Sequence, residues 1–360
     1  MKKLISLMIT FMLLVGVMAG CGASEVTTGS QASADPAASS PASDGEETAP
    51  AASGGSVTYK LGHMAPLDNN YNLFAERFKS LVEEKTDGRI KIEIYPQAQL
   101  GYDRDLLESM QFGGNVDFAV NTSSPITNFA PLLSVLDLPY LLQDWDHIES
   151  FIQSDIAAKL LSECEEAGLM GLSIMGRGFR SASNNKHPIN TLDDIKGVKL
   201  RVVESAAFVK TFEDFGAITS AMSFGEVFTA LQQGAIDGQE NPPETIYAER
   251  VYEVQKYLSL TQHIAGWACL MSSKSTWDAI PPEDQVLIRE CAIEAAIAET
   301  KVNRESEAGF IEKLKEEGME VNDLDRTPFI EVATSAYKWF ESTYKSEGME
   351  YVNAIRALKP

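Results

Sequence analysis

Alternating strand-like and helix-like segments are the feature that most restricts how this chain can fold. Tyr71, Phe74, Phe78 and Leu81 recur at the spacing of a helix that buries one face. Short apolar runs on either side predict strands. The predicted order is strand, helix, strand, helix, strand, over residues 57–62, 71–81, 89–95, 103–111 and 116–120. This order indicates a mostly parallel sheet with helices on both faces.

The same alternation begins again after Gly176. A helix-start box at 191–194 is followed by a predicted strand at 198–203. A predicted helix then runs to about residue 215, and a second strand follows at 217–222. Ser223 and Glu226 match the S-x-x-E capping box, so another helix begins there and ends before a strand at 236–240. Two α/β units in one chain predict two lobes with a cleft between them.

The C-terminal part of the chain is more helical. Residues 282–318 are predicted to form one long helix, and residues 327–346 another. A helix of about 35 residues is about 50 Å long. We therefore expect the first of these helices to bridge both lobes and to couple their movement.

A short stretch of sequence occurs twice with small changes. Residues 110–117 and 231–237 each combine a helix end, a glycine turn, an apolar residue and Asp, and they lead to Asn121 and Asn241. If the two copies are equivalent, both Asn residues lie at the carboxyl ends of corresponding strands. Ligands bind at that edge of open α/β sheets.

The N-terminal segment predicts export. Lys2 and Lys3 precede an almost wholly apolar run at 4–18 and the small residues Ala19 and Gly20, as in a secretory signal peptide. Cys21 follows, and this resembles the lipobox of bacterial lipoproteins, in which the cysteine is lipidated. An uncleaved short anchor is the alternative. Residues 22–56 carry no Lys, Arg or aromatic residue, so we expect a disordered tether.

Charge excludes some classes of partner. The 52 Asp and Glu outnumber the 30 Lys and Arg, for a formal net charge of −22. A nucleic-acid or anionic-lipid partner would need a basic footprint, so neither is expected.

Cys164, Cys269 and Cys291 could hold one disulfide or be ordinary core residues. No zinc-type spacing and no nucleotide-binding, hydrolase or metalloprotease motif is present, so we expect no metal, cofactor or enzyme activity.

One segment carries a net positive charge, in contrast to the acidic chain as a whole. Residues 168–203 carry six cations against two carboxylates: Arg177, Arg180, Lys186, Lys196, Lys199 and Arg201 against Asp193 and Asp194. An acidic protein that holds an anion needs such fixed cations, and the planar fork of Arg suits a carboxylate. Arg201 lies among apolar strand residues and must have a partner. That partner is either a ligand or a structural carboxylate such as Glu204.

Asn241 has a competing structural interpretation. It precedes Pro242, Pro243 and Glu244, which together form a complete helix-start signal with Asn as the N-cap. A plain N-cap role does not exclude function, because a helix N-terminus is itself an anion site.

Several of these segments resemble, in order and spacing, the solute-binding proteins of TRAP transporters, the DctP-like family. The strongest match is D-G-Q-E-N-P at 237–242. Others are 62–63, 99–101, 136–140, 197–203, 222–227, 230–234, 251–261 and Trp277. The resemblance covers nearly all of 57–360. It implies a two-lobed α/β fold like that of periplasmic binding proteins, with a hinge, a ligand cleft between the lobes and a long helix spanning both.

The resemblance also implies roles and boundaries. The family's carboxylate-binding Arg falls on Arg201, a second polar contact on Arg180, and the ligand-contacting Phe and Asn on Phe224 and Asn241. The expected organisation is a signal peptide at 1–20, a lipid-anchored linker at 21–56, and two lobes. These are 57–177 with about 266–305, and 178–265 with about 306–360. The expected partner is a TRAP membrane permease, and the protein is expected to be a monomer outside the cytoplasm.

Further polar residues are weaker candidates for the cleft: His63, Asn70, Asp103, Asn121 and Thr122. His63 either faces the cleft or lies in a solvent-exposed loop, and Asp103 alternatively caps its helix. Such a polar lining favours a hydroxylated acid such as a uronate. C4-dicarboxylates, keto acids and sialic acid remain open as ligands. A sensory binding module that docks on a signalling receptor is the alternative function.

Overall fold

A computed structural model of the protein describes residues 56–360, which belong to one compact unit. The predicted signal peptide, the lipidated Cys21 and all of the predicted linker except Ser56 lie outside the described residues. No helix of the described part is long and apolar enough to span a membrane.

One mixed sheet organises this unit, in the order β2-β1-β3-β8-β4-β7-β5-β6, with β9 paired to β8. Two groups of three parallel strands form its ends, and both follow the same plan, with the first strand in the middle and the third strand innermost. The first group is β1 (Val57–Gly62), β2 (Ile90–Tyr95) and β3 (Phe118–Thr122), and the second is β5 (Lys199–Val202), β6 (Ile218–Ala221) and β7 (Gly238–Asn241).

Two long antiparallel strands, β4 (Leu169–Asn184) and β8 (Tyr257–Ser273), join these groups. The end of β8 pairs with β3, and the end of β4 pairs with β7. Between these stretches the register of β4 shifts at Gly176 and Gly178, where Gly178 has a φ of +98° that suits glycine. The chain therefore crosses from one half of the sheet to the other at a bulge.

The sequence predicted the two α/β units, and the two-lobed α/β fold class is confirmed. It did not predict β4 and β8, and the prediction of a mostly parallel sheet missed this antiparallel centre. Strand bounds differ from the predicted ones by one or two residues at most ends. The helix-start box at 191–194 forms, but it opens only the short 3-10 helix Leu192–Ile195.

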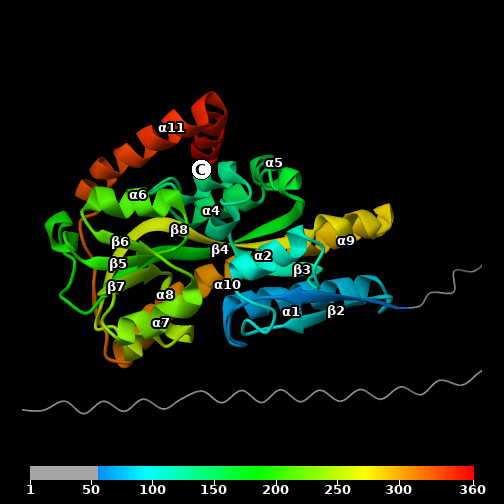
Figure 1. Cartoon of the computed structure of the whole chain (residues 1–360), viewed down its shortest axis with the longest axis horizontal. Helices are drawn as coiled ribbons and strands as arrows, with labels where there is room; N and C mark the ends of the chain where they lie inside the picture. The colour runs from blue at the N-terminus through cyan, green and yellow to red at the C-terminus, as the bar shows by residue number, and fades with distance from the viewer. Residues whose placement is uncertain (1–55) are drawn as a thin grey trace, which may run out of the picture. The chain divides into compact units, whose positions relative to one another are not determined.

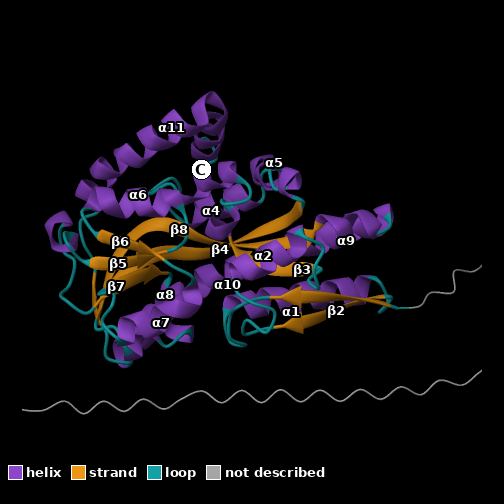
Figure 2. Cartoon of the chain, in the orientation of Figure 1, coloured by secondary structure: helices purple, strands orange, loops and turns teal. Residues whose placement is uncertain are grey.

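Helices cover both faces of the central strands (Figure 2). Side chains of β8 alternate, so Trp267 and Cys269 join the cluster under α4, α5 and α11, while Ala268 and Leu270 join the cluster under α1 and α10. The bounds are α1 (Asn70–Lys85), α2 (Asp103–Gln111), α3 (Ser123–Ile126), α4 (Trp145–Ile152), α5 (Asp155–Ser162), α6 (Ala206–Phe215), α7 (Phe224–Gln232), α8 (Pro243–Ala248), α9 (Lys274–Ala279), α10 (Pro282–Glu316) and α11 (Thr327–Arg356).

The long helix α10 agrees with its prediction. It has 35 residues and contacts α1 and α4 beside the first strand group and α8 and β9 beside the second. Helix α11 also reaches both groups, from α6 to α5 (Figure 1). The sequence prediction ended α11 at residue 346, but helix resumes beyond Lys345, the one non-helical residue within its span. Cys164, Cys269 and Cys291 are buried free thiols, so no disulfide joins them.

Candidate ligand-binding site

A pocket lies between the two strand groups. The carboxyl ends of β3 and β7, strand β5, the crossing of β4 and the starts of α2 and α7 supply its walls. Of the predicted residues, Arg201, Asn241, Arg180, Phe224, Asp103 and Thr122 line it, whereas His63, Asn70 and Asn121 do not.

Arg201 is a buried cation that forms no ion pair with a carboxylate in the described part of the chain. Its side chain is 2% exposed, and Nε and Nη2 both donate to the backbone carbonyl of Met222, at 3.1 and 2.8 Å. The predicted structural alternative, an ion pair with Glu204, is wrong, since no ion pair of Arg201 forms among the described residues. Burial, and to a lesser extent Arg180, lowers the pKa of Arg201 to about 10 against the opposing charges of Glu240 and Glu204.

Arg180 differs, because a buried carboxylate already neutralises it. Its Nε and Nη2 donate to the two carboxylate oxygens of Glu240 at 2.5 and 2.9 Å, and Nη2 also donates to the Glu240 carbonyl at 2.7 Å. His263 Nε2 lies 3.1 Å from the same carboxylate. Burial raises the pKa of Glu240, but the Arg180 charge and these hydrogen bonds outweigh it and bring the pKa to about 2. A role of Arg180 in ligand binding stays a prediction.

Arg177 is a pocket residue that sequence reasoning did not select. It lies within the bulge of β4 between Gly176 and Gly178. Its guanidinium donates to Asn70 Oδ1, to Tyr71 Oη and to Thr245 Oγ1, at 3.2, 3.1 and 2.5 Å. The Glu244 carboxylate lies 3.7 Å away. Arg177 thus ties α1 to α8 across the pocket floor. The positive segment 168–203 was the available signal, but spacing alone could not separate Arg177 from its neighbours.

Asn241 and Phe224 frame the side of the pocket next to Arg201. Asn241 is the last residue of β7, 4% exposed, and its Nδ2 donates to Gln239 Oε1 at 2.6 Å. The N-cap prediction for Asn241 is wrong, because Pro242 occupies that position and α8 begins at Pro243. The half-buried Phe224 ring lies 5.6 Å from the Arg201 guanidinium carbon. Helix α7 starts after Ser223 as predicted, though without a side-chain cap bond.

The first strand group supplies polar groups that are bonded to one another. The Asp103 carboxylate accepts from the Thr122 backbone and from Asn121 Nδ2, both at 3.1 Å, and Thr122 Oγ1 lies 2.7 Å from Tyr71 Oη. Tyr102, not Asp103, is the N-cap of α2. Burial raises the pKa of Asp103 despite these bonds. Asn121 lies behind Asp103, so it supports the wall instead of lining the pocket.

His63 and Asn70 have structural surroundings. His63 is fully buried, so it is neither exposed nor in the pocket, and Nε2 lies 3.2 Å from Asn72 Oδ1. Burial lowers the pKa of His63 to about 4, against the raising effect of Asn72. Asn70 is also buried and holds Arg177 in place. Its contribution to ligand binding could only be indirect.

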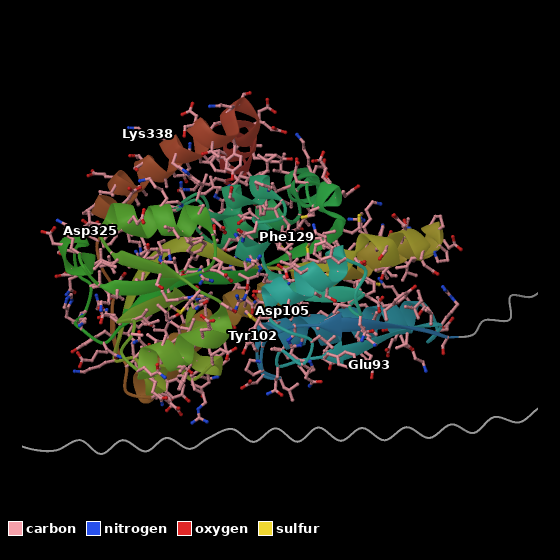
Figure 3. The ribbon with its side chains drawn as sticks, viewed as in Figure 1. Glu93, Tyr102, Asp105, Phe129, Asp325 and Lys338 are labelled. Carbon is pink, nitrogen blue, oxygen red and sulfur yellow. The ribbon has the colours of Figure 1, made fainter. Side chains whose placement is uncertain are left out.

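One contact beside the pocket joins the two strand groups. Tyr102 precedes α2, and its ring lies against Gly225 at the start of α7, so that a Cβ on Gly225 would lie 2.4 Å from Tyr102 Cζ. Figure 3 shows Tyr102 where the cyan and green parts of the ribbon meet. A larger residue at this position would require the Tyr102 ring to move aside. Within residues 56–360, no cluster of three or more His, Cys, Asp or Glu could hold a metal ion.

Comparison with known proteins extends this description. The model of bacterial extracellular solute-binding protein family 7, DctP, matches residues 61–343. The sialic acid-binding periplasmic protein SiaP of Vibrio cholerae is 32% identical, over 84% of this chain and 93% of SiaP. Other relatives are named for C4-dicarboxylates.

Solved structures show the same similarity. A TRAP periplasmic solute-binding protein from Polaromonas sp. JS666, bound to D-erythronate, superposes with a TM-score of 0.80 at 34% identity, covering 84% of this chain and 99% of that one. One from Sulfitobacter sp. NAS-14.1, with bound β-D-galacturonate, gives 0.79 at 30% identity, covering 84% and 100%. The resemblance seen in the sequence is therefore confirmed.

Proposed function

The chain belongs to family 7 of the bacterial extracellular solute-binding proteins, and we propose that it captures a sugar acid in this pocket and delivers it to a TRAP membrane permease. Relatives in this family are extracellular or periplasmic solute-binding proteins, and this supports a binding role for the chain and not a catalytic one. The observation that carries the proposal is Arg201, a buried guanidinium that faces the pocket with a single carbonyl as its partner. A ligand carboxylate would complete its hydrogen bonds.

Sugar acids are favoured because the rest of the lining is polar. Asn241, Thr122 and Asp103 offer donors and acceptors that suit hydroxyl groups. The related structures with D-erythronate and β-D-galacturonate hold ligands of this kind. Relatives named for C4-dicarboxylates make those acids the second candidate class.

We further propose that binding closes the two lobes about the bulge in β4. The proposed boundaries are 57–177 with about 266–305, and 178–265 with about 306–360. The bulge between Gly176 and Gly178 supports a hinge there, since register shifts bend a strand. Lipidation of Cys21 would hold this unit at the outer face of the cell membrane.

A thermal-shift screen of the purified unit 54–360 tests the proposal. We expect uronates or aldonates to raise the melting temperature, because a ligand that binds only the folded state stabilises it. C4-dicarboxylates and keto acids form the other arms of the screen. Absence of any shift, with no ligand found by native mass spectrometry, would contradict organic-acid binding. A two-part membrane permease encoded beside this chain would favour transport over a sensory role.

A further inference from the structure

Glu249 places a carboxylate in the same pocket as Arg177, Arg180 and Arg201. It is the C-cap of α8, and its backbone N–H donates to the carbonyl of Thr245 at 3.0 Å. Residues four apart on a helix lie on one face. Thr245 lines the pocket and accepts from Arg177, and Glu249 lines the pocket beside it. The half-buried Glu249 is therefore a pocket residue.

Within the described part of the chain, Glu249 has no ion-pair partner. The adjacent Arg250 forms its ion pair with Glu253. Arg177 directs its guanidinium to Asn70, Tyr71 and Thr245. A partly buried carboxylate without a donor is unfavourable unless another molecule supplies one.

The charged surroundings of Glu249 and Arg201 differ. Glu249 faces Glu244 from α8, Asp68 from the loop before α1, and Arg177 from β4. Burial raises the pKa of Glu249 to about 7. The negative charges of Glu244 and Asp68 contribute to this rise, and the positive charge of Arg177 opposes it. The charges nearest Arg201 are instead Glu240, Arg180, Glu204 and Asp103. Arg201 on β5 and Glu249 at the end of α8 thus bring a fixed cation and a carboxylate to the pocket from two different elements.

We propose that Glu249 is a specificity-determining residue, which makes the pocket select a hydroxylated monocarboxylate over the dicarboxylate of the same carbon skeleton. The inference rests on the proposed function and extends it. With one carboxylate on Arg201, a hydroxyl at the far end of the ligand can donate to Glu249. A second carboxylate there would meet a like charge, which disfavours the wrong ligand.

Matched acids test this proposal by titration calorimetry of the unit 54–360. Each aldonate is compared with the aldarate of the same skeleton: D-erythronate with meso-tartrate, galactonate with galactarate, and gluconate with glucarate. We expect the preferred aldonate to bind at least about tenfold more tightly than its aldarate. Glu249→Gln should strengthen aldarate binding by about tenfold and weaken aldonate binding, so that the two affinities move in opposite directions.

Glu253→Gln is the matched control, since it removes the same charge from an exposed residue four positions away. It should leave the aldonate-to-aldarate ratio unchanged. The wild-type protein provides a test that needs no folded variant. Lowering the pH from 8 to 6 protonates Glu249, so aldarate affinity should rise relative to aldonate affinity, and Glu249→Gln should abolish this change.

The outcomes separate the two proposals. If neither acids of these pairs nor other organic acids bind, the proposed function is wrong. If aldonates bind but aldarates bind equally well at pH 8, or the wild-type ratio does not change between pH 8 and 6, the role of Glu249 is wrong while organic-acid binding stands. A ratio that Glu249→Gln and Glu253→Gln alter equally would also overturn the role of Glu249.

Discussion

The strand ends of the two sheet halves differ in how their polar groups are partnered. Beside β3, the Asp103 carboxylate accepts from Asn121 and Thr122, and Thr122 is bonded to Tyr71. In the second strand group, the hydrogen bonds of the Arg201 side chain within residues 56–360 go to one backbone carbonyl, that of Met222. The polar groups of the first half are therefore mostly bonded to one another, although Asn121 Oδ1 has no partner among the described residues, and the second half offers an unneutralised charge. A buried charge without a counterion is unfavourable, so the free energy of neutralising it is available to a ligand.

Replacing Arg201 should weaken ligand binding more than any other single change at the pocket. We expect Arg201→Ala to lower affinity for the preferred acid by about 10²–10³-fold, because a buried charge pair is worth about 3–5 kcal/mol when one partner is removed. Titration calorimetry measures the loss. Arg201→Lys is the matched variant, since it keeps the charge but not the planar fork, and its affinity should fall between the two. Unchanged binding in Arg201→Ala would refute the assignment.

Replacing Arg180 should instead reduce folding stability. Arg180→Ala leaves the Glu240 carboxylate buried with His263 as its neighbour, at an expected cost of about 3–5 kcal/mol in the free energy of unfolding. Urea denaturation measures it. Arg201→Ala should cost much less in the same experiment. The double variant Arg180→Met/Glu240→Gln should recover most of the loss, because it removes both charges at once.

Gly225→Ala tests the contact beside the pocket at which the two halves touch. The added methyl would lie 2.4 Å from Tyr102 Cζ, and overpacking of this kind costs about 1–3 kcal/mol. We expect about tenfold weaker ligand binding, mainly through faster dissociation measured by stopped flow. Adding Tyr102→Ala should restore binding in the Gly225→Ala background. If the double variant binds no better than Gly225→Ala, the contact does not act in closure.

Asp137 links the two halves of the molecule through hydrogen bonds. Its carboxylate accepts from Ser124 Oγ on α3 at 2.9 Å and from Ser205 Oγ before α6 at 2.6 Å. Burial raises the pKa of Asp137 to about 7, and the two serines only partly oppose this. A carboxyl whose folded-state pKa is raised binds its proton more tightly in the folded protein than in the unfolded chain. The free energy of unfolding should therefore fall as the pH rises from about 4 to about 7. The expected slope is at most about 1.4 kcal/mol per pH unit.

Asp137→Asn is the matching variant, because the amide oxygen can still accept from a serine while the charge is absent. Denaturation midpoints between pH 4 and 7 should then lose the part of the decrease that Asp137 causes. Identical pH profiles for the variant and the wild-type protein would exclude titration of Asp137 in this range.

Local signals predicted the regular elements well. Helix 103–111 has the predicted bounds, and β1 does too, because apolar periodicity within one segment determines them. Strands β4 and β8 were missed because they bury polar residues such as Arg177, Ser183 and His263. Their partners come from distant parts of the chain, so a periodicity search treats those positions as exposed.

The site was predicted in part for the same reason. Arg201 and Asn241 could be selected because motif and charge pointed to them before any tertiary contact was known. The burial of His63 and the replacement of Asn241 as N-cap by Pro242 depend on packing between segments. Arg177 gains its importance only from α1 and α8, which meet it in the folded chain.

The two crossing strands also constrain the order in which the chain can fold. Strand β3 ends at Thr122, yet its neighbour in the sheet is β8, which starts at Tyr257. During synthesis or passage across a membrane from the N-terminus, the first strand group therefore keeps an open inner edge until most of the chain has emerged. Contacts of such long sequence separation slow folding. An early intermediate would expose β3 to pairing with other chains, so a holding chaperone should bind this chain before β8 emerges.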